Sequence, residues 1–436
     1  LRKSPIFFAI LQLVRFLSDP LNMMKIILTL ILLCFMNTIS SQNPFFETYS
    51  TLHSTVPFDK IKTGDYVPAI REGIRRQNAE IEAIIRNPEV PTFANTVLAY
   101  EKSGEMLHRV STVFGNLLSA ETDDDLQELA KEIMPMMSEH ENNISLNEEL
   151  FARIKAVYEQ QDKETLSPEQ HKLLEDIYNG FVRNGANLLG EDKEKYRALC
   201  KELSLLTLQF SENNLKETND YKLVITDKSQ LAGLPESAVE AAAETAGEKG
   251  VEGWVFTLQA PSYGPFLTYA DSRDLRRELY MAYNTKCTHD NASNNLEIVK
   301  KLANVRMEIA QLLGYDNFAE YNLQERMAQN SESVYKLLDQ LLEAYTPTAK
   351  QEYAEVQALA RQAEGEDFVL MPWDWAYYSH KLKDRKFNID DELLRPYFEL
   401  NNVKQGVFGL ATRLYGITFK KNPDIPVYHK DVDAYE

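Results

Sequence analysis

Apolar residues recur every three or four positions along most of this 436-residue chain. Ile70, Ile74, Ile81 and Ile84 form one such stripe, and the segments Leu199–Phe210 and Ile298–Leu312 contain others. This spacing places apolar side chains on one face of an α-helix. The chain is therefore predicted to be mainly α-helical.

Helix boundary signals support this prediction. Ser167-Pro168-Glu169-Gln170 combines an N-cap, a proline at the first helical position and a capping-box glutamine. Thr122 with Asp125 resembles a second capping box, and Pro135 is expected to kink or end the helix that follows it. Gly314 is expected to end the helix of the Ile298–Leu312 stripe.

Two short segments alternate between apolar and polar residues, as strands do. They are Tyr221–Thr226 and Trp254–Leu258, with an alanine-rich helix expected between them around Val239–Ala246. We interpret residues 221–270 as a small α/β insert. Two further extended signals lie near the end, at Ile417–Phe419 and Val427–Val432.

The composition of the chain limits the kinds of molecule that it is expected to bind. With 44 % apolar residues the chain is expected to bury a core, and its 47 basic and 66 acidic residues give a net charge of −19. Phosphate repels such a protein, so nucleic acid is not an expected partner. Cys34, Cys200 and Cys287 form no CxxC motif; Cys200 and Cys287 are expected as two separate thiols, with a disulfide as the alternative.

The first 41 residues are interpreted as a leader. Lys25 precedes an apolar run of 11 residues, Ile26–Met36, and small residues follow at Thr38, Ser40 and Ser41. This is the layout of a secretory signal peptide, with translation starting at Met23 or Met24. It favours a periplasmic or secreted protein with no permanent membrane anchor. The alternatives are a buried core helix or an anchor.

The sequence contains no recognisable catalytic motif. A helical zinc site usually needs two histidines four residues apart, but the closest two of the seven histidines are 31 residues apart. His140-Glu141 begins an HExxH motif, but the motif is not completed. Neither its last position nor the following residue, Ser145, is a histidine. No GxSxG motif or P-loop is present. We therefore predict no catalytic and no metal-binding residue in this chain.

One aromatic cluster is a candidate binding element. Residues 371–378, MPWDWAYY, contain four large aromatic side chains, and Asp374 is expected to cap a helix there. Trp375, Tyr378 and Leu382 would lie on one helix face. The segment either seals a core or forms the wall of a peptide groove; in the second case Trp373, Trp375 and Tyr378 would bind substrate.

Six segments, in order, resemble the thimet oligopeptidase and peptidyl-dipeptidase family of zinc metallopeptidases (peptidase family M3). The resemblance extends from about residue 43 to the end, and the residues that carry it are Asn43–Lys60, Pro91–Thr96, Tyr269–Tyr280, Asn304–Met327, Trp373–Leu382 and, at the end, Leu414–Ile417 together with Pro426–Glu436. It implies a two-lobed helical fold that is incomplete at its C-terminus. The expected regions are a helical region over 42–220, the insert, and the front part of the catalytic domain over 271–436.

The resemblance also implies a function. In the family, zinc is held by an HExxH helix and a later glutamate, and it activates water for peptide hydrolysis. None of these positions maps onto this chain, so Zn²⁺ is expected only in a longer parent protein and the chain alone is expected to be inactive. The parent is expected to be a monomer that releases C-terminal dipeptides from short unstructured peptides. The alternatives are an endopeptidase of the same family and a non-catalytic helical protein that binds peptides or a partner.

Overall fold

The computed structural model describes residues 43–161, 165–388 and 391–436, so the predicted leader lies outside the described residues. The chain divides into two compact units. Among the described residues, unit 1 contains residues 43–133, 152–161, 165–178 and 419–436, and unit 2 contains residues 134–151, 179–388 and 391–418. Three of the four boundaries fall inside helices, namely α6 (Asp124–Ser145), α7 (Glu148–Glu159) and α8 (Pro168–Arg183), and the fourth lies between residues 418 and 419.

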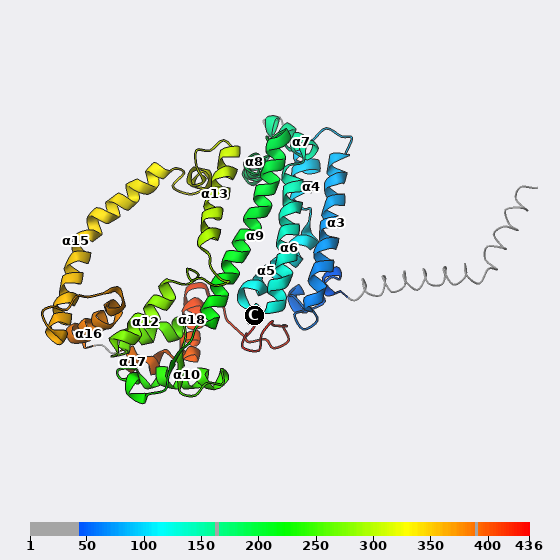
Figure 1. Ribbon diagram of the computed structural model, residues 1–436. Coiled ribbons are helices and arrows are strands. Elements are labelled where there is room, and N and C mark those ends of the chain that lie inside the picture. Colours follow the sequence, from blue (N-terminus) through cyan, green and yellow to red (C-terminus); the bar gives the residue numbers. More distant parts are fainter. Residues whose placement is uncertain (1–42, 162–164, 389–390) are drawn as a thin grey trace, which may run out of the picture. The chain divides into compact units, whose positions relative to one another are not determined.

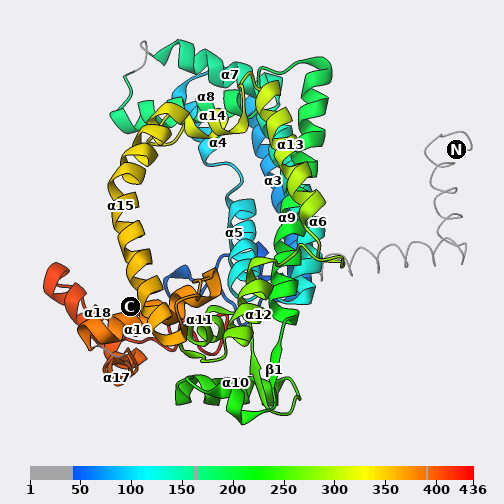
Figure 2. The same ribbon diagram turned by 60° about the vertical axis from the view of Figure 1, so that its left-hand side comes forward.

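Unit 1 is built around two helices that pack against each other. Helices α3 (Tyr66–Ile85) and α5 (Glu105–Ala120) pack along each other, and both are labelled in Figures 1 and 2. Gly73 on α3 permits this approach, because a Cβ atom there would lie 2.9 Å from the Cα atom of Leu107 on α5. Besides parts of the three shared helices, the unit contains short helices η1 (Pro44–Phe46), η2 (Leu52–Ser54), η3 (Thr63–Asp65) and η4 (Phe93–Val97), and α-helices α3 (Tyr66–Ile85), α4 (Leu98–Glu101) and α5 (Glu105–Ala120).

Unit 2 contains a second pair of packed helices, the two strands and the helices named below. Helix α9 (Gly190–Asp220) packs along α13 (Leu296–Leu312). Helix α13 buries most of its predicted stripe, and α9 buries Leu199 and Leu206, whereas Phe210 at the end of its predicted stripe is 38 % exposed. The two helices run side by side in opposite directions near the centre of Figure 1. The other helices are η6 (Lys228–Leu231), α10 (Glu236–Glu248), α11 (Ala260–Tyr269), α12 (Arg273–Asn284), α14 (Phe318–Leu323), α15 (Ser331–Glu364), η7 (Pro372–Asp374), α16 (Trp375–Phe387), α17 (Asp391–Leu394), η8 (Arg395–Phe398) and α18 (Leu400–Tyr415).

Among the described residues the only sheet is a two-stranded one in unit 2. Strand β1 (Leu223–Ile225) pairs antiparallel with β2 (Trp254–Phe256), with Val224 opposite Val255. Leu223 and Ile225 point into the core and Val224 points outward, as the alternating pattern predicts. Helix α10 lies between the strands in sequence. The prediction of a mainly α fold with a small strand-containing segment is thereby confirmed.

Two of the predicted helix boundaries are confirmed. The Ser167 hydroxyl accepts a hydrogen bond from the Gln170 N–H at 3.3 Å, and the Gln170 side chain accepts one from the Ser167 N–H at 2.9 Å, so α8 begins with a capping box. Gly314 has a φ of +85° and ends α13.

Three other local features differ from the simplest form of the prediction. Asp123, not Thr122, caps α6, because its carboxylate accepts the Leu126 N–H at 2.7 Å. Of the two alternatives predicted for Pro135, a kink or the end of the helix, the second is wrong, because α6 continues to Ser145. Near the end, the predicted extended segments form no strand among the described residues; the backbone instead pairs at a single bridge between Lys421 and Tyr435.

The described cysteines are free thiols, as predicted. Cys287 is buried and Cys200 is half-buried, and neither forms a disulfide. Burial is the main reason why the pKa of the Cys287 thiol is raised to about 11. In the part of the chain that the structure describes, no helix has the length and apolar character needed to cross a membrane.

Candidate functional site

The aromatic segment lies where α16 meets α12 and the end of α15, all within unit 2. Helix α12 begins at a serine cap, because the Ser272 hydroxyl accepts the Leu275 N–H at 3.4 Å. This start places Arg273 and Arg276 three residues apart on one side of the first turn of α12. The short helix η7 then brings Asp374 to both arginines.

Asp374 is completely buried and forms two ion pairs. Its Oδ2 accepts a hydrogen bond from Arg273 Nη2 at 2.7 Å, and its Oδ1 accepts one from Arg276 Nη2 at 3.0 Å. The Met371 N–H also donates to Asp374 Oδ2 at 3.0 Å. The hydrogen bonds to Asp374 are the largest cause of the raised pKa of the Arg273 guanidinium. We call Arg273, Arg276 and Asp374 the ion cluster.

Arg276 connects the ion cluster to the surrounding backbone. Its side chain is 1 % exposed and donates to the carbonyls of Ala270, Asp271 and Trp373 at 2.7, 3.1 and 3.3 Å. Its guanidinium also lies over the ring of Tyr377, 4.0 Å from the centroid. Arg276 therefore has acceptors or an aromatic face on several sides, which a buried guanidinium requires.

Sequence patterns did not identify either arginine as an ion-pair partner of Asp374. It placed them in the family-like segment Tyr269–Tyr280, but they lie about a hundred positions from their partner. The predicted side-chain cap by Asp374 is wrong, because its carboxylate makes no capping hydrogen bond to α16 and accepts from the arginines and Met371 instead.

The three predicted substrate-binding residues have different environments. Trp375 is 40 % exposed and its ring lies parallel to that of Tyr353, with centroids 6.3 Å apart. Trp373 is half-buried, with the Arg277 guanidinium over its ring and the ring of Tyr280 edge-on to it. Tyr378 is 2 % exposed and its hydroxyl donates to Glu364 at 2.7 Å; burial raises its pKa. Only Trp375 thus presents a large part of its ring to solvent, and the substrate-binding role of the three remains a prediction.

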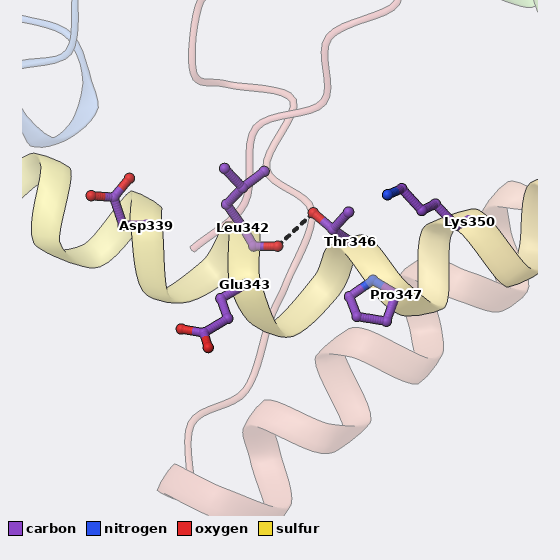
Figure 3. A pocket seen from close by; sticks show the side chains of 6 residues that line it. All are labelled: Asp339, Leu342, Glu343, Thr346, Pro347 and Lys350. Carbon is purple, nitrogen blue, oxygen red and sulfur yellow. Dashed lines mark hydrogen bonds between the residues drawn. The ribbon is translucent and has the colours of Figure 1, made fainter.

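A surface depression lies on another part of unit 2. It is lined by residues of α15 alone, and Figure 3 shows their side chains projecting from successive turns: Asp339, Leu342, Glu343, Thr346, Pro347 and Lys350. A feature on a single exposed helix has no opposing wall to enclose a ligand. It contains none of the aromatic residues predicted to bind substrate.

The described residues do not fit a zinc site. Nowhere among them do three or more histidine, cysteine, aspartate or glutamate side chains come together in a way that would hold a metal ion. His140, from the incomplete motif, is buried on α6, and burial lowers its pKa. We therefore derive no zinc-dependent step from these residues.

Comparisons with known proteins identify the class. Residues 266–436 match the model of peptidase family M3. The chain is 38 % identical to dipeptidyl carboxypeptidase of Escherichia coli over 401 residues, which are 91 % of this chain and 59 % of that protein. It is 33 % identical to oligopeptidase A of the same organism, covering 87 % of this chain and 56 % of that one, and 31 % identical to an organellar oligopeptidase A of Arabidopsis thaliana, covering 91 % and 50 %.

The chain belongs to peptidase family M3, as the sequence motifs indicated. It spans somewhat less than three-fifths of the length of the curated relatives described above. The matched residues include the ion cluster and the aromatic segment, so both are parts of the family region.

Proposed function

We propose that the protein containing this chain is a zinc-dependent metallopeptidase that hydrolyses short peptides and releases C-terminal dipeptides. The observation that carries this proposal is the 38 % identity to a dipeptidyl carboxypeptidase over 91 % of the chain. The lower identity of 33 % to oligopeptidase A favours dipeptide release over internal cleavage. Short unstructured peptides are the proposed substrates, and the periplasm or the exterior of the cell is the proposed location.

Within this proposal, the described residues supply framework and binding surface, not the metal site. The ion cluster fixes the start of α12 to η7, and η7 leads directly into α16 with the exposed Trp375. A firmly anchored aromatic ring is well suited to contact an apolar peptide side chain. The zinc and its ligands would be supplied elsewhere in the functional protein, which is why we expect the 436-residue chain to be inactive alone.

The proposal predicts chelator-sensitive dipeptide release. The protein is expressed from the complete reading frame that encodes this sequence and is incubated with short peptides, with and without a metal chelator. We expect mass spectrometry to show loss of two residues from the C-terminus, inhibition by the chelator and recovery with zinc. The 436-residue chain, assayed in parallel, is expected to show no cleavage.

Other results would support the alternatives. Chelator-sensitive cleavage at internal bonds would favour an oligopeptidase, and binding of peptides without any cleavage would favour a non-catalytic helical protein. Cleavage that continues undiminished in the chelator would contradict the proposed metal dependence.

Replacing Trp375 with alanine tests the binding surface in the active protein. Because the ring is 40 % exposed, we expect Trp375→Ala to leave the melting temperature nearly unchanged and to raise KM by roughly three- to tenfold at constant kcat. The matched variant is Tyr378→Phe, which removes the hydrogen bond to Glu364 and is expected to cost about 1 kcal/mol of stability without raising KM. A Trp375→Ala protein with lower stability and normal KM would assign the ring to packing.

A further inference from the structure

Residues 419–436 belong to unit 1, although the chain before them belongs to unit 2. The segment closes on itself, because Lys420 and Glu436 exchange two backbone hydrogen bonds of 2.9 Å. The Asn422 N–H donates to the Ala434 carbonyl, also at 2.9 Å. None of the residues 419–436 is buried. A segment with so little buried surface has low local stability, so a few contacts decide whether it stays in place. We call residues 419–436 the docked segment.

Side-chain contacts of two kinds join the docked segment to the rest of unit 1, one aromatic and the others ionic. They are Phe58 with Tyr428, His53 with Glu436, and Glu121 with His429. The two rings meet edge-on with their centroids 5.6 Å apart. The imidazole Nε2 atoms lie 2.5 Å from Glu436 Oε1 and 4.0 Å from Glu121 Oε1. Both ionic contacts therefore join a histidine to a carboxylate.

His53 reaches Glu436 from a strained turn. His53 and Ser54 both have a φ of +55°, in the left-handed region that residues other than glycine rarely adopt. Across this turn the Thr55 hydroxyl donates to the Leu52 carbonyl at 3.0 Å. Such a conformation persists only where surrounding contacts hold it, and the contact with Glu436 is one of them. The turn and the docked segment therefore support each other.

The contact between His53 and Glu436 changes character with pH. The hydrogen bond with His53 is the largest cause of the lowered pKa of Glu436, and Asn422 and Lys420 lower this pKa further. Glu436 is therefore ionised throughout the range in which histidines titrate. An unperturbed imidazole is charged only below a pH of about 6.5. The contact is thus an ion pair in weak acid and a weaker hydrogen bond from a neutral ring at alkaline pH.

His429 faces two carboxylates. Its Nε2 faces Glu121, the residue directly after α5, and its Nδ1 lies 3.7 Å from Oδ2 of Asp431 in the docked segment itself. The same Nδ1 accepts a hydrogen bond from the Asp431 N–H at 3.2 Å, which protonation of Nδ1 removes. The charged ring exchanges this hydrogen bond for attraction to both carboxylates. Protonation therefore favours docking here as well, but less than at His53, where no hydrogen bond is lost.

We propose that residues 419–436 are a pH-sensitive clasp, held on unit 1 while His53 and His429 are protonated and released more readily when both are neutral. The stabilising charge is present in weak acid and is lost as the pH rises through the range in which imidazoles deprotonate. One exposed ion pair contributes modestly. Because the docked segment has no buried residue, two such pairs are enough to change its docking severalfold. The clasp is a conformational device and does not depend on the proposed peptidase activity.

Amide hydrogen exchange tests the clasp. The protein expressed from the complete reading frame is labelled at about pH 5.5 and about pH 8, either side of the histidine range. Exchange rates are corrected for the known effect of pH on unstructured peptides. We expect the protection of residues 419–436 and of residues 51–58 to be at least roughly threefold higher in acid. Peptides from α3 serve as the internal reference and should be protected equally at both values.

Variants identify the groups responsible. His53→Gln and Glu436→Gln should each lower the protection in acid by roughly threefold, and the two together should lower it no further, because they break the same ion pair. His429→Gln should have a smaller effect of the same kind. The matched control is His108→Gln, since His108 is an exposed histidine on α5 of the same unit, and it should keep the full difference between the two pH values.

Three results would overturn the proposal. The first is equal protection of the docked segment at both pH values. The second is a pH difference that survives in the double variant His53→Gln/His429→Gln, since other groups would then cause it. The third is a difference that is confined to residues 419–436 and absent from residues 51–58, which would indicate that the segment opens by itself without leaving unit 1.

Discussion

Asp374→Ala is expected to destabilise unit 2 by about 3–5 kcal/mol, because it leaves Arg276 buried without its counter-charge. The Arg276 side chain is 1 % exposed, so water does not solvate its guanidinium in the folded protein. The substitution also removes the acceptor of Arg273 and of the Met371 N–H. Urea unfolding followed by tryptophan fluorescence measures the effect, since Trp373 and Trp375 flank the substituted position.

The control is a solvent-exposed ion pair on the surface of the protein. Glu297→Ala on α13 removes the partner of Lys300, which lies on the surface, and is expected to leave the unfolding midpoint almost unchanged. A further comparison replaces both members with apolar residues of similar size, Arg276→Met with Asp374→Leu, and is expected to recover part of the loss. If Asp374→Ala is no more damaging than Glu297→Ala, the ion cluster does not stabilise the fold.

Local patterns in the sequence predicted the helices and the strand pair well. The stripe on α13 and the capping box at Ser167 depend on residues within one or two turns of each other, so spacing alone reveals them. The same holds for β1 and β2, where alternation identifies the inward side chains. In contrast, the choice between Thr122 and its neighbour Asp123 as the cap of α6 depends on the backbone angles at that turn.

The ion cluster shows why the candidate site was harder to predict. Asp374 before a helix resembles a capping residue, and local propensity favours that role. Two arginines about a hundred positions earlier compete for the same carboxylate, and charge-assisted hydrogen bonds to a buried group are stronger than a cap. No local spacing in the sequence brings these residues together.

The aromatic segment illustrates a related difference. Helical spacing placed Trp375 and Tyr378 on one face, but their exposures are 40 % and 2 %. Trp375 is the first residue of α16 and lies beside Tyr353, whereas Tyr378, one turn later, enters a core with Val356 and Leu370. Periodicity defines a direction around a helix, but it does not determine how far a neighbouring element extends along it.

Phe266→Ala is expected to destabilise the strand-containing part of unit 2 by about 3–5 kcal/mol. Phe266 on α11 is fully buried and meets Phe256 of β2 edge-on, with ring centroids 4.6 Å apart. It also belongs to the apolar cluster that holds Leu223 and Ile225 of β1. Removing the ring leaves a cavity under both strands, and a two-stranded sheet has little stability without such support. Trp254 on β2 provides a local fluorescence signal for unfolding.

Val224→Ala provides the comparison within the same sheet. Val224 lies between two buried residues of β1 but points outward and is 39 % exposed, so its truncation is expected to cost less than about 1 kcal/mol. The two variants therefore separate loss of core packing from loss of strand propensity. Equal destabilisation would mean that the strands are held by their own pairing, and that α11 contributes little to the support of the sheet. A large effect at Phe266 alone would show that the insert is stabilised by the helix packed beneath it.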